Sequence, residues 1–313
     1  AEYGSDALRL GLIASRSPGQ NQAFSTDRII SGRNFCNKLW NIARFVENLL
    51  GDHYELATPV PKTLADHWII SELKTANDNI ERSIDSYRFA EAGENVYHAI
   101  WDSVADWYIE ASKQEPNHDL LAWVLNTSLK LAHPFAPFVT ETIWQTLPWN
   151  NTILMTEGWP TMINYSEIAA GEFARVQELV TEARFVANSL PGNQRYNLVY
   201  FKDSLIEDNQ TLIKRLAKLG DIELVDQPRG VRLAVTGRDA WLDVSAATLA
   251  EHQTNLEQRL ASTHSDVRAL EARLGNENYV AKAPAKLVEE TKNQLQDKQE
   301  LIKRLQQELE VLQ

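Results

Sequence analysis

The sequence has a single cysteine, Cys36, and no apolar run long enough to cross a membrane. One cysteine excludes an internal disulfide and a zinc site built from several cysteines. A transmembrane helix needs about 20 consecutive apolar residues. The first ten residues, AEYGSDALRL, lack the basic start and apolar stretch of a secretory signal. These absences favour a cytosolic protein with no membrane partner.

Catalytic and metal-binding motifs are also missing. The histidines are scattered without ligand spacing, and the chain has neither a glycine-rich phosphate loop nor a Gly-x-Ser-x-Gly turn. Asp106 and Glu110 share one helix face, but aromatic residues separate them, so we interpret them as a solvated rim over packed rings. His133 precedes a proline and is interpreted as structural. The sequence therefore predicts no catalytic residues and no metal site.

The net charge of −12 argues weakly against nucleic-acid binding. The charge is unevenly spread, however. Residues 1–50 carry six Lys/Arg against four Asp/Glu, whereas residues 51–165 carry six against sixteen. A locally basic surface is therefore compatible with an acidic protein.

The first half of the chain has the apolar periodicity of amphipathic helices. Ser25 to Asp27 are capping candidates for a long helix that ends at Gly51, and prolines interrupt the chain at Pro59, Pro61 and within HPFAPF (133–138). Short connections favour an antiparallel helical bundle. The expected helices are 1–15, 25–50, 64–89, 89–112, 119–131 and 138–147.

After residue 150 the pattern changes twice. Residues 148–165 are interpreted as an irregular linker, followed by a helix over 168–189 and the alternating strand-like YNLVYF (196–201). A helix over 205–220 and short strands follow, which together predict a small α/β module. The expected short strands are 221–225, 231–235 and 240–244.

The last seventy residues contain two seams of leucines and other residues spaced alternately by three and four. The two seams match as antiparallel partners, with Leu274 opposite Val288 and Leu256 opposite Leu305. This pairing predicts a helical hairpin, and a rise of 1.5 Å per residue gives it a length of roughly 40 Å. The predicted fold is thus mainly α: an antiparallel helical bundle, a small α/β module and a C-terminal antiparallel coiled-coil hairpin. The seam positions are Leu249, Leu256, Leu260, Thr263, Val267, Leu270, Leu274 and Val288, Thr291, Leu295, Lys298, Ile302, Leu305, Leu309, Leu312.

The helix over 25–50 has an unusual polar side. Phe35, Leu39, Ile42 and Val46 form one apolar stripe suited to a core. The residues opposite suit single-stranded RNA, because amides read base edges, cations neutralise phosphates and an exposed ring stacks on a base. The alternative is an ordinary solvated surface with Phe45 packed under a neighbouring helix. We call this set the polar face; it consists of Arg33, Asn34, Asn37, Lys38, Asn41, Arg44 and Phe45, with Trp40 at its border.

The hairpin turn is a second candidate binding region. Basic residues gather toward this end of the arm, and an aromatic ring lies at the turn. A charged coiled-coil surface without a ligand is the alternative. The candidate residues are Arg268, Arg273, Tyr279, Lys282 and Lys286.

Several stretches resemble valyl-tRNA synthetases, a family of class I aminoacyl-tRNA synthetases. They are YGSDALRL (3–10), RNFCNKLWNIARFV (33–46), DWYIE (106–110), HPFAPFVTETIW (133–144) and the turn NYVAKAPAKLVEE (278–290). The resemblance implies a C-terminal part of such an enzyme, without its catalytic and editing domains. It also implies four parts: a stem-contact segment (1–24), an anticodon-binding bundle (25–150), a linker with the small module (151–244) and a tRNA-binding arm (245–313).

The same resemblance assigns roles to residues. The polar face would read the anticodon of valine tRNA, and Arg9 and Arg16 would touch the tRNA stem. In the arm, Arg273, Tyr279, Lys282 and Lys286 would contact the tRNA corner. The resemblance implies that relatives often carry an arginine pair near 184–187, but here Arg184 is followed by Ala187, which puts tRNA contact by the small module in doubt.

The resemblance further implies a cytoplasmic monomer that serves ATP- and magnesium-dependent valylation in the longer enzyme. It implies no cofactor on this chain and no DNA partner. Two alternatives stay open. The coiled coil is also typical of a protein-interaction or oligomerisation module, and the bundle is shared with isoleucine and leucine enzymes.

Overall fold

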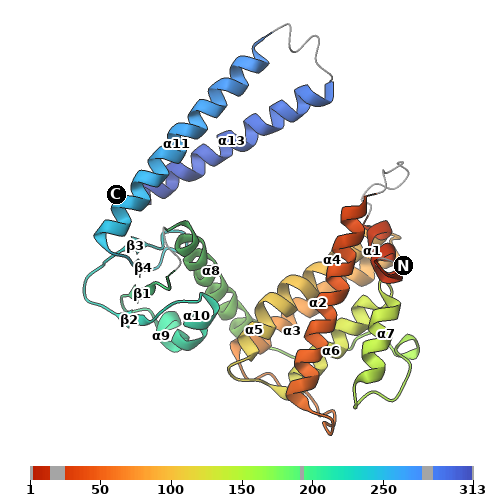
Figure 1. Cartoon of the computed structure of the whole chain (residues 1–313). Helices are drawn as coiled ribbons and strands as arrows, with labels where there is room; N and C mark the ends of the chain where they lie inside the picture. The colour runs from red at the N-terminus through yellow and green to blue at the C-terminus, as the bar shows by residue number, and fades with distance from the viewer. Residues whose placement is uncertain (1–2, 15–24, 191–193, 277–284, 312–313) are drawn as a thin grey trace. The chain divides into compact units, whose positions relative to one another are not determined.

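Figure 1 shows the computed structural model of the chain. It describes residues 3–14, 25–190, 194–276 and 285–311, with the backbone alone at 285, 286 and 311. The chain forms two compact units, Ala1–Arg175 and Val176–Gln313. Within the described ranges, no helix combines the length and apolar character needed to span a membrane. The mainly α fold predicted from the sequence is confirmed.

The first unit is built from helices (Figure 1), and its connections are short except for residues 51–63 between α2 and α3 and the segments 15–24 and 147–166. The predicted helix over 64–89 ends earlier, at Asp85, because Tyr87 takes a left-handed backbone with φ 57° and turns the chain. The helix from residue 89 to 112 contains a central π-helical stretch, a geometry often found near functional sites. The elements are α1 (Ser5–Ile13), α2 (Thr26–Leu50), α3 (Leu64–Asp85), α4 (Phe89–His98), the π-helix η1 (Ala99–Tyr108), α5 (Ile109–Ser112), α6 (His118–Ala132), α7 (Pro137–Thr146) and the 3₁₀ turn η2 (Leu154–Thr156).

Helix α2 buries the stripe predicted for it. Phe35, Leu39, Ile42 and Val46 are all at most 4% exposed, so the hydrophobic effect fixes the rotation of α2 about its axis. Gly32 belongs to the same contact: a Cβ there would lie 2.7 Å from the Ala7 carbonyl oxygen, so glycine lets α1 approach α2 closely. The side of α2 that carries the polar face is thereby directed away from the core.

A buried carboxylate holds the start of α3. Asp66 is 2% exposed and forms a capping box with Thr63, in which each side chain accepts a hydrogen bond from the other residue's backbone N–H. Its oxygens also accept hydrogen bonds from the Tyr108 hydroxyl at 3.0 Å and the Asn117 amide at 2.8 Å. Asp66 thus ties α3 to η1 and to the start of α6.

The second unit begins in α8 (Glu167–Ser189) and contains a four-stranded sheet of order β2-β1-β4-β3. Strand β1 pairs parallel with β2 and antiparallel with β4, and β4 pairs antiparallel with β3. The single helix predicted over 205–220 is wrong: two short helices form, because Asn209 leaves the helical conformation at φ −121°. The remaining elements are β1 (Asn197–Tyr200), α9 (Ser204–Asp208), α10 (Gln210–Leu216), β2 (Ile222–Leu224), β3 (Val231–Arg232) and β4 (Ala240–Asp243).

The arm is formed by α11 (Ala246–Leu274) and α13 (Ala285–Val311), which pack along each other as the predicted hairpin (Figure 1). Leu256 and Leu305 are each 1% exposed, and Thr263 and Thr291 are also buried in the seam. His252 fills the seam position between Leu249 and Leu256, where the sequence pattern skips an apolar residue. Seam residue Lys298 instead reaches Asp266 on the facing helix, with its Nζ 2.8 Å from Oδ2.

Candidate nucleic-acid interface

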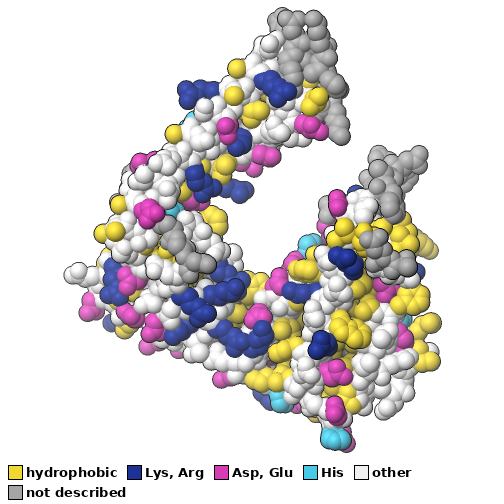
Figure 2. Space-filling view, in the orientation of Figure 1, with side chains coloured by type: hydrophobic (Ala, Val, Ile, Leu, Met, Phe, Trp, Pro, Cys, Tyr) yellow, Lys and Arg dark blue, Asp and Glu magenta, His cyan; other side chains and the backbone are white. Residues whose placement is uncertain are grey.

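The polar face is solvent-accessible over most of its length. Five of its residues are exposed, and Lys38 and Phe45 are half-buried at one edge. Figure 2 shows dark-blue side chains separated by uncharged ones along the front of the first unit, where α2 runs. Amides and cations alternate along this surface, with the apolar rings of Trp40 and Phe45 among them. Its exposed members are Arg33, Asn34, Asn37, Asn41 and Arg44.

One edge of the polar face is bounded by η1. Lys38 Nζ lies 2.8 Å from Asp106 Oδ1 and 5.0 Å from the centre of the Trp101 ring. Trp101 stacks on Tyr97, with ring centres 5.4 Å apart. Burial, followed by the charges of Asp102 and Asp106, raises the pKa of Tyr97. Lys38 is thus held in place by a carboxylate and an aromatic face, and its charge is largely neutralised.

Phe45 also lies at this edge. Its ring is half-buried, and Lys113 Nζ lies 5.9 Å from the ring centre. Lys113 in turn pairs with Glu110, while Asp106 pairs with Lys38. Asp106 is exposed and Glu110 partly exposed, and each carboxylate pairs with a surface lysine, as expected for the solvated rim. Part of the Phe45 ring remains accessible for stacking.

The opposite edge of the polar face holds a pocket of about 340 Å³. Trp40 lines it and is 38% exposed, so this border residue is not part of the core. Phe138 is 62% exposed, and Arg33 lies over the Tyr3 ring at 5.7 Å. Sequence reasoning did not group Tyr3 and Phe138 with α2, because only the packing of α1 and α7 brings them there. The pocket combines flat rings with a guanidinium and the Asn37 amide, the groups that hold an unstacked base.

Asp6 fixes the geometry of this pocket. The carboxylate is 7% exposed, and its oxygens accept hydrogen bonds from the backbone N–H groups of Phe138 and Val139, the latter at 2.7 Å. A carboxylate at the N-terminal end of α7 also interacts favourably with the helix dipole. Burial, followed by the charge of Asp6, raises the pKa of the neighbouring Cys36 thiol to about 12. Cys36 is therefore a neutral thiol at physiological pH.

The two predicted stem-contact residues have different outcomes. Arg9 is exposed, and its guanidinium donates hydrogen bonds to the carbonyls of Pro134 and Phe135 at 3.1 and 3.4 Å. It therefore supports the break between α6 and α7, with the rest of its surface open to solvent. Arg16 lies outside the described residues.

The predicted arm residues lie at the far end of the hairpin. Arg273 is exposed in the last turn of α11 and makes a contact within the chain. Lys286 belongs to the first turn of α13, although its side chain is not described. Tyr279 and Lys282 lie outside the described residues. Across the described part of the chain, no group of three His, Cys, Asp or Glu side chains is placed to hold a metal ion. His133 bonds Thr140 instead, with Nδ1 2.8 Å from Oγ1.

Comparison with known proteins identifies two parts of the chain. Residues 66–194 match the family described as the anticodon-binding domain of tRNA ligase, and residues 248–313 match the valyl tRNA synthetase tRNA binding arm. The chain belongs to the valyl-tRNA synthetase family. Helix α2 precedes the first matched region. The polar face therefore rests on the sequence and the geometry of α2 and not on the match to the anticodon-binding domain.

Whole-sequence relatives agree with the valyl-tRNA synthetase assignment. The valine–tRNA ligase of Geobacillus kaustophilus is 32% identical over 322 residues, which cover 95% of this chain and 37% of that protein. The valine–tRNA ligase of Bacillus subtilis is 31% identical over 325 residues, again with 95% and 37% covered. The chain thus spans little more than a third of these relatives. Among solved structures, a LeuRS–tRNA–LeuAMS ternary complex from Agrobacterium radiobacter K84 has a TM-score of 0.43, with 16% identity, 64% of this chain and 22% of that chain covered.

Proposed function

We propose that this chain is the tRNA-recognition part of a valine–tRNA ligase, with valine tRNA as its partner. The observation that carries the proposal is the exposed Arg/Asn surface of α2, flanked by accessible aromatic rings. It belongs to a chain that also has a tRNA-ligase anticodon-binding domain and a tRNA-binding arm. The four-part division at 24, 150 and 244 belongs to the same proposal.

The polar face would read the anticodon. Asn34, Asn37 and Asn41 offer amides to base edges, and Arg33 and Arg44 offer guanidinium groups to bases and phosphates. Phe45 and Trp40 supply one accessible ring at each edge, so unpaired bases would stack at both sides of the amides. Lys38 would contribute less charge than the sequence suggests, because Asp106 holds it.

The arm would support the tRNA corner through Arg273, Tyr279, Lys282 and Lys286, and Arg9 and Arg16 would face the tRNA stem. The rival role, a coiled coil that pairs with another protein, is not favoured by the buried seam. Leu256, Val267 and Leu305 are covered by the facing helix of the same chain. We propose a monomer, which static light scattering would test directly: a dimer would favour the rival.

Aminoacylation itself would belong to the longer cytoplasmic enzyme, with ATP and magnesium. The sequence of this chain shows no catalytic motif, so ATP and magnesium are placed in the longer enzyme. No catalytic step is therefore assigned to its residues. Their work would be to bind, orient and select the tRNA, with phosphate contacts giving affinity and base contacts giving specificity.

The test is fluorescence anisotropy with two labelled tRNAs at two salt concentrations. One is valine tRNA, and the other differs from it only in the anticodon. We expect preference for the valine anticodon, lost in Asn41→Ala and in Phe45→Ala. Asn255→Ala, at an exposed position on α11, is the matched control and should keep the preference. Equal binding of both tRNAs by the unaltered protein would refute anticodon reading by the polar face.

A further inference from the structure

A second basic surface lies in the small α/β module, at the C-terminal end of α10. Figure 2 shows Lys and Arg side chains gathered over the part of the second unit where α8 and α10 lie in Figure 1. Two contacts bring separate segments together there. Arg184 Nε donates to the Leu216 carbonyl at 2.7 Å, and Gly220 N donates to the Tyr196 carbonyl at 2.8 Å, beside Arg195. We call this group the α10 cluster; it consists of Arg184, Arg195, Lys214, Arg215 and Lys218.

The backbone at Lys218 is unusual. Helix α10 ends with the N–H of Leu219 bonded to the Lys214 carbonyl and the N–H of Lys218 bonded to the Arg215 carbonyl. This arrangement, a Schellman motif, needs a left-handed residue and favours glycine there. Lys218 takes that conformation at φ 56°, although glycine would adopt it without strain. The helix dipole favours a cation at this position. Lys218 places its charge there at the cost of a strained backbone that glycine would avoid.

Carboxylates do not account for most of the cluster. Lys214 Nζ lies 3.1 Å from Asp221 Oδ1, and Arg184 donates a hydrogen bond to the Leu216 carbonyl. Among the described residues, no acidic side chain pairs with Arg195, Arg215 or Lys218. Cations near a helix C-terminus interact favourably with its dipole, which gives Lys214 and Arg215 a structural role. The dipole gives the same role to Lys218, directly after the C-cap Ala217, but does not explain Arg195, which precedes β1.

We propose that the α10 cluster binds the phosphate backbone of RNA. The inference rests on the proposed function and deepens it by assigning the small module a contact of its own. Arg195, Arg215 and Lys218 pair with no acidic side chain of the described residues and come from two segments, so together they complement a polyanion through charge alone. Such contacts are independent of base sequence and sensitive to salt.

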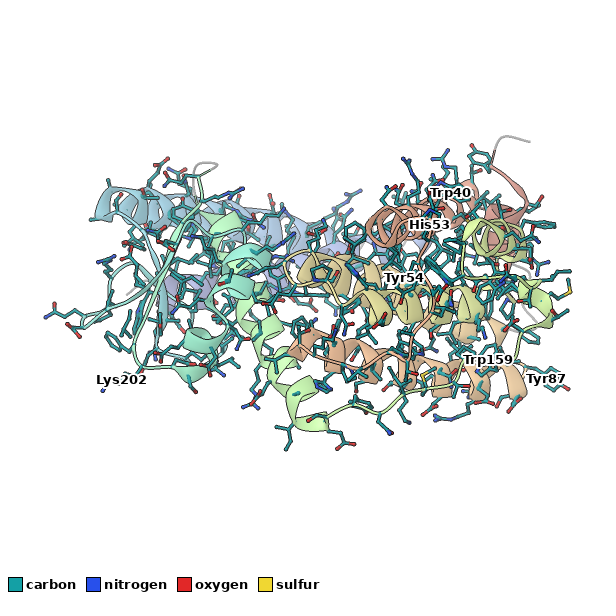
Figure 3. All side chains as sticks on the ribbon, turned by 90° about the horizontal axis from the view of Figure 1, so that it is seen from below. Trp40, His53, Tyr54, Tyr87, Trp159 and Lys202 are labelled. Atoms are coloured by element: carbon teal, nitrogen blue, oxygen red, sulfur yellow. The ribbon has the colours of Figure 1, made fainter. Side chains whose placement is uncertain are left out.

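The decisive variant is Lys218→Gly, because it removes the cation and relieves the strained backbone. We expect its thermal unfolding midpoint to stay the same or rise, while its affinity for tRNA falls. The plot of log affinity against log salt should become shallower by about one for each phosphate that the variant no longer binds. Arg215→Gln should act in the same direction. Lys202→Gln is the matched control: Lys202 is exposed on the same module, after the other end of β1, and is labelled in Figure 3.

The two tRNAs that differ only in the anticodon separate this inference from the proposed function. The fall in affinity of Lys218→Gly should be equal for both, whereas a fall in discrimination belongs to the polar face. Unchanged affinity and salt slope in both Lys218→Gly and Arg215→Gln would overturn the inference while leaving anticodon reading intact. Equal weakening by Lys202→Gln would also overturn it, because general charge would then explain the effect. If the unaltered chain bound neither tRNA, both proposals would fail.

Discussion

Lys38 and Asp106 form an ion pair across 68 residues of sequence, with the ammonium 2.8 Å from the carboxylate. The pair lowers the positive charge of the polar face and holds Lys38 over Trp101. Because both side chains are partly exposed, the pair contributes only about 0–1 kcal/mol to stability. Its larger consequence is for binding, since a lysine engaged by an acid is less available to a phosphate.

The first prediction concerns this pair. Asp106→Asn should release Lys38 and tighten tRNA binding, with the salt dependence steeper by up to about one phosphate. Stability should hardly change. Fluorescence anisotropy over a salt series measures the effect. Asp78→Asn removes an ion pair of similar length, Lys74–Asp78 at 2.9 Å, on α3 and serves as the control. Weaker binding by Asp106→Asn would instead mean that Asp106 orients Lys38 for the RNA.

The second prediction concerns Trp40. Stacking of a base on an aromatic side chain is worth about 1–3 kcal/mol, so Trp40→Ala should weaken tRNA binding by roughly 5- to 150-fold. Trp159 is a close control, because it is 37% exposed against 38% for Trp40. Figure 3 shows the two rings on opposite sides of the first unit. Equal losses in Trp40→Ala and Trp159→Ala would contradict a base site at the polar face.

Local periodicity predicted much of the fold. The stripe of α2 and the seams of the arm follow from residue spacing alone, because a helix repeats its faces every 3.6 residues. Breaks caused by backbone conformation were harder to predict. The left-handed Tyr87 and the helix interruption at Asn209 have no proline or glycine to mark them.

The candidate site was only partly predictable for a different reason. The polar residues of α2 share one helix, so their spacing already places them together. Their neighbours come from distant segments: Tyr3 from before α1, Trp101 from η1 and Phe138 from α7. No single-sequence pattern encodes such long-range packing. Likewise, the α10 cluster depends on a helix end and a strand start that meet only in the folded unit.

The third prediction concerns the buried Asp66. Its carboxylate accepts hydrogen bonds from the backbone N–H groups of Lys62 and Thr63 and from the side chains of Asn117 and Tyr108. All of these groups are donors, so the NH2 of an asparagine would face at least one donor without an acceptor. Asp66→Asn should therefore destabilise the first unit by roughly 3 kcal/mol, whereas Tyr108→Phe should cost about 1 kcal/mol. Urea unfolding followed by tryptophan fluorescence reports mainly on this unit, since Trp241 is the one tryptophan of Val176–Gln313. Equal losses would argue against a central role for the carboxylate.

The fourth prediction concerns pH and the base of the arm. His252 is 4% exposed in the seam and lines a pocket of about 180 Å³ with Glu182 and Arg232 of the module and Arg304 and Glu308 of α13. Burial, followed by the charge of Arg259 on its own helix, lowers the pKa of His252. Burial raises the pKa of Glu308. Protonation of these two groups at low pH therefore changes the stability of the folded chain in opposite directions.

The sign for His252 follows from proton binding. As pH falls below the ordinary histidine pKa of about 6.5, His252 of the unfolded chain binds a proton, whereas His252 of the folded chain stays neutral until a lower pH. Its contribution to stability is therefore complete above pH 6.5 and is lost as pH falls toward the lowered folded value. Glu308 opposes this at lower pH, since the folded carboxyl binds its proton first. Burial also lowers the pKa of His133. The first unit therefore also loses stability as pH falls.

His252→Leu isolates the contribution of the seam. Leucine continues the apolar seam and does not titrate, so the variant should lose less stability than the unaltered chain between pH 7.5 and 5.5. Thermal unfolding followed by circular dichroism at the two pH values measures this difference. His264→Leu, at an exposed position of the same helix, leaves His252 in place and should retain the full pH dependence. Identical pH dependence in the two variants would show that His252 is not the group whose protonation loosens the arm.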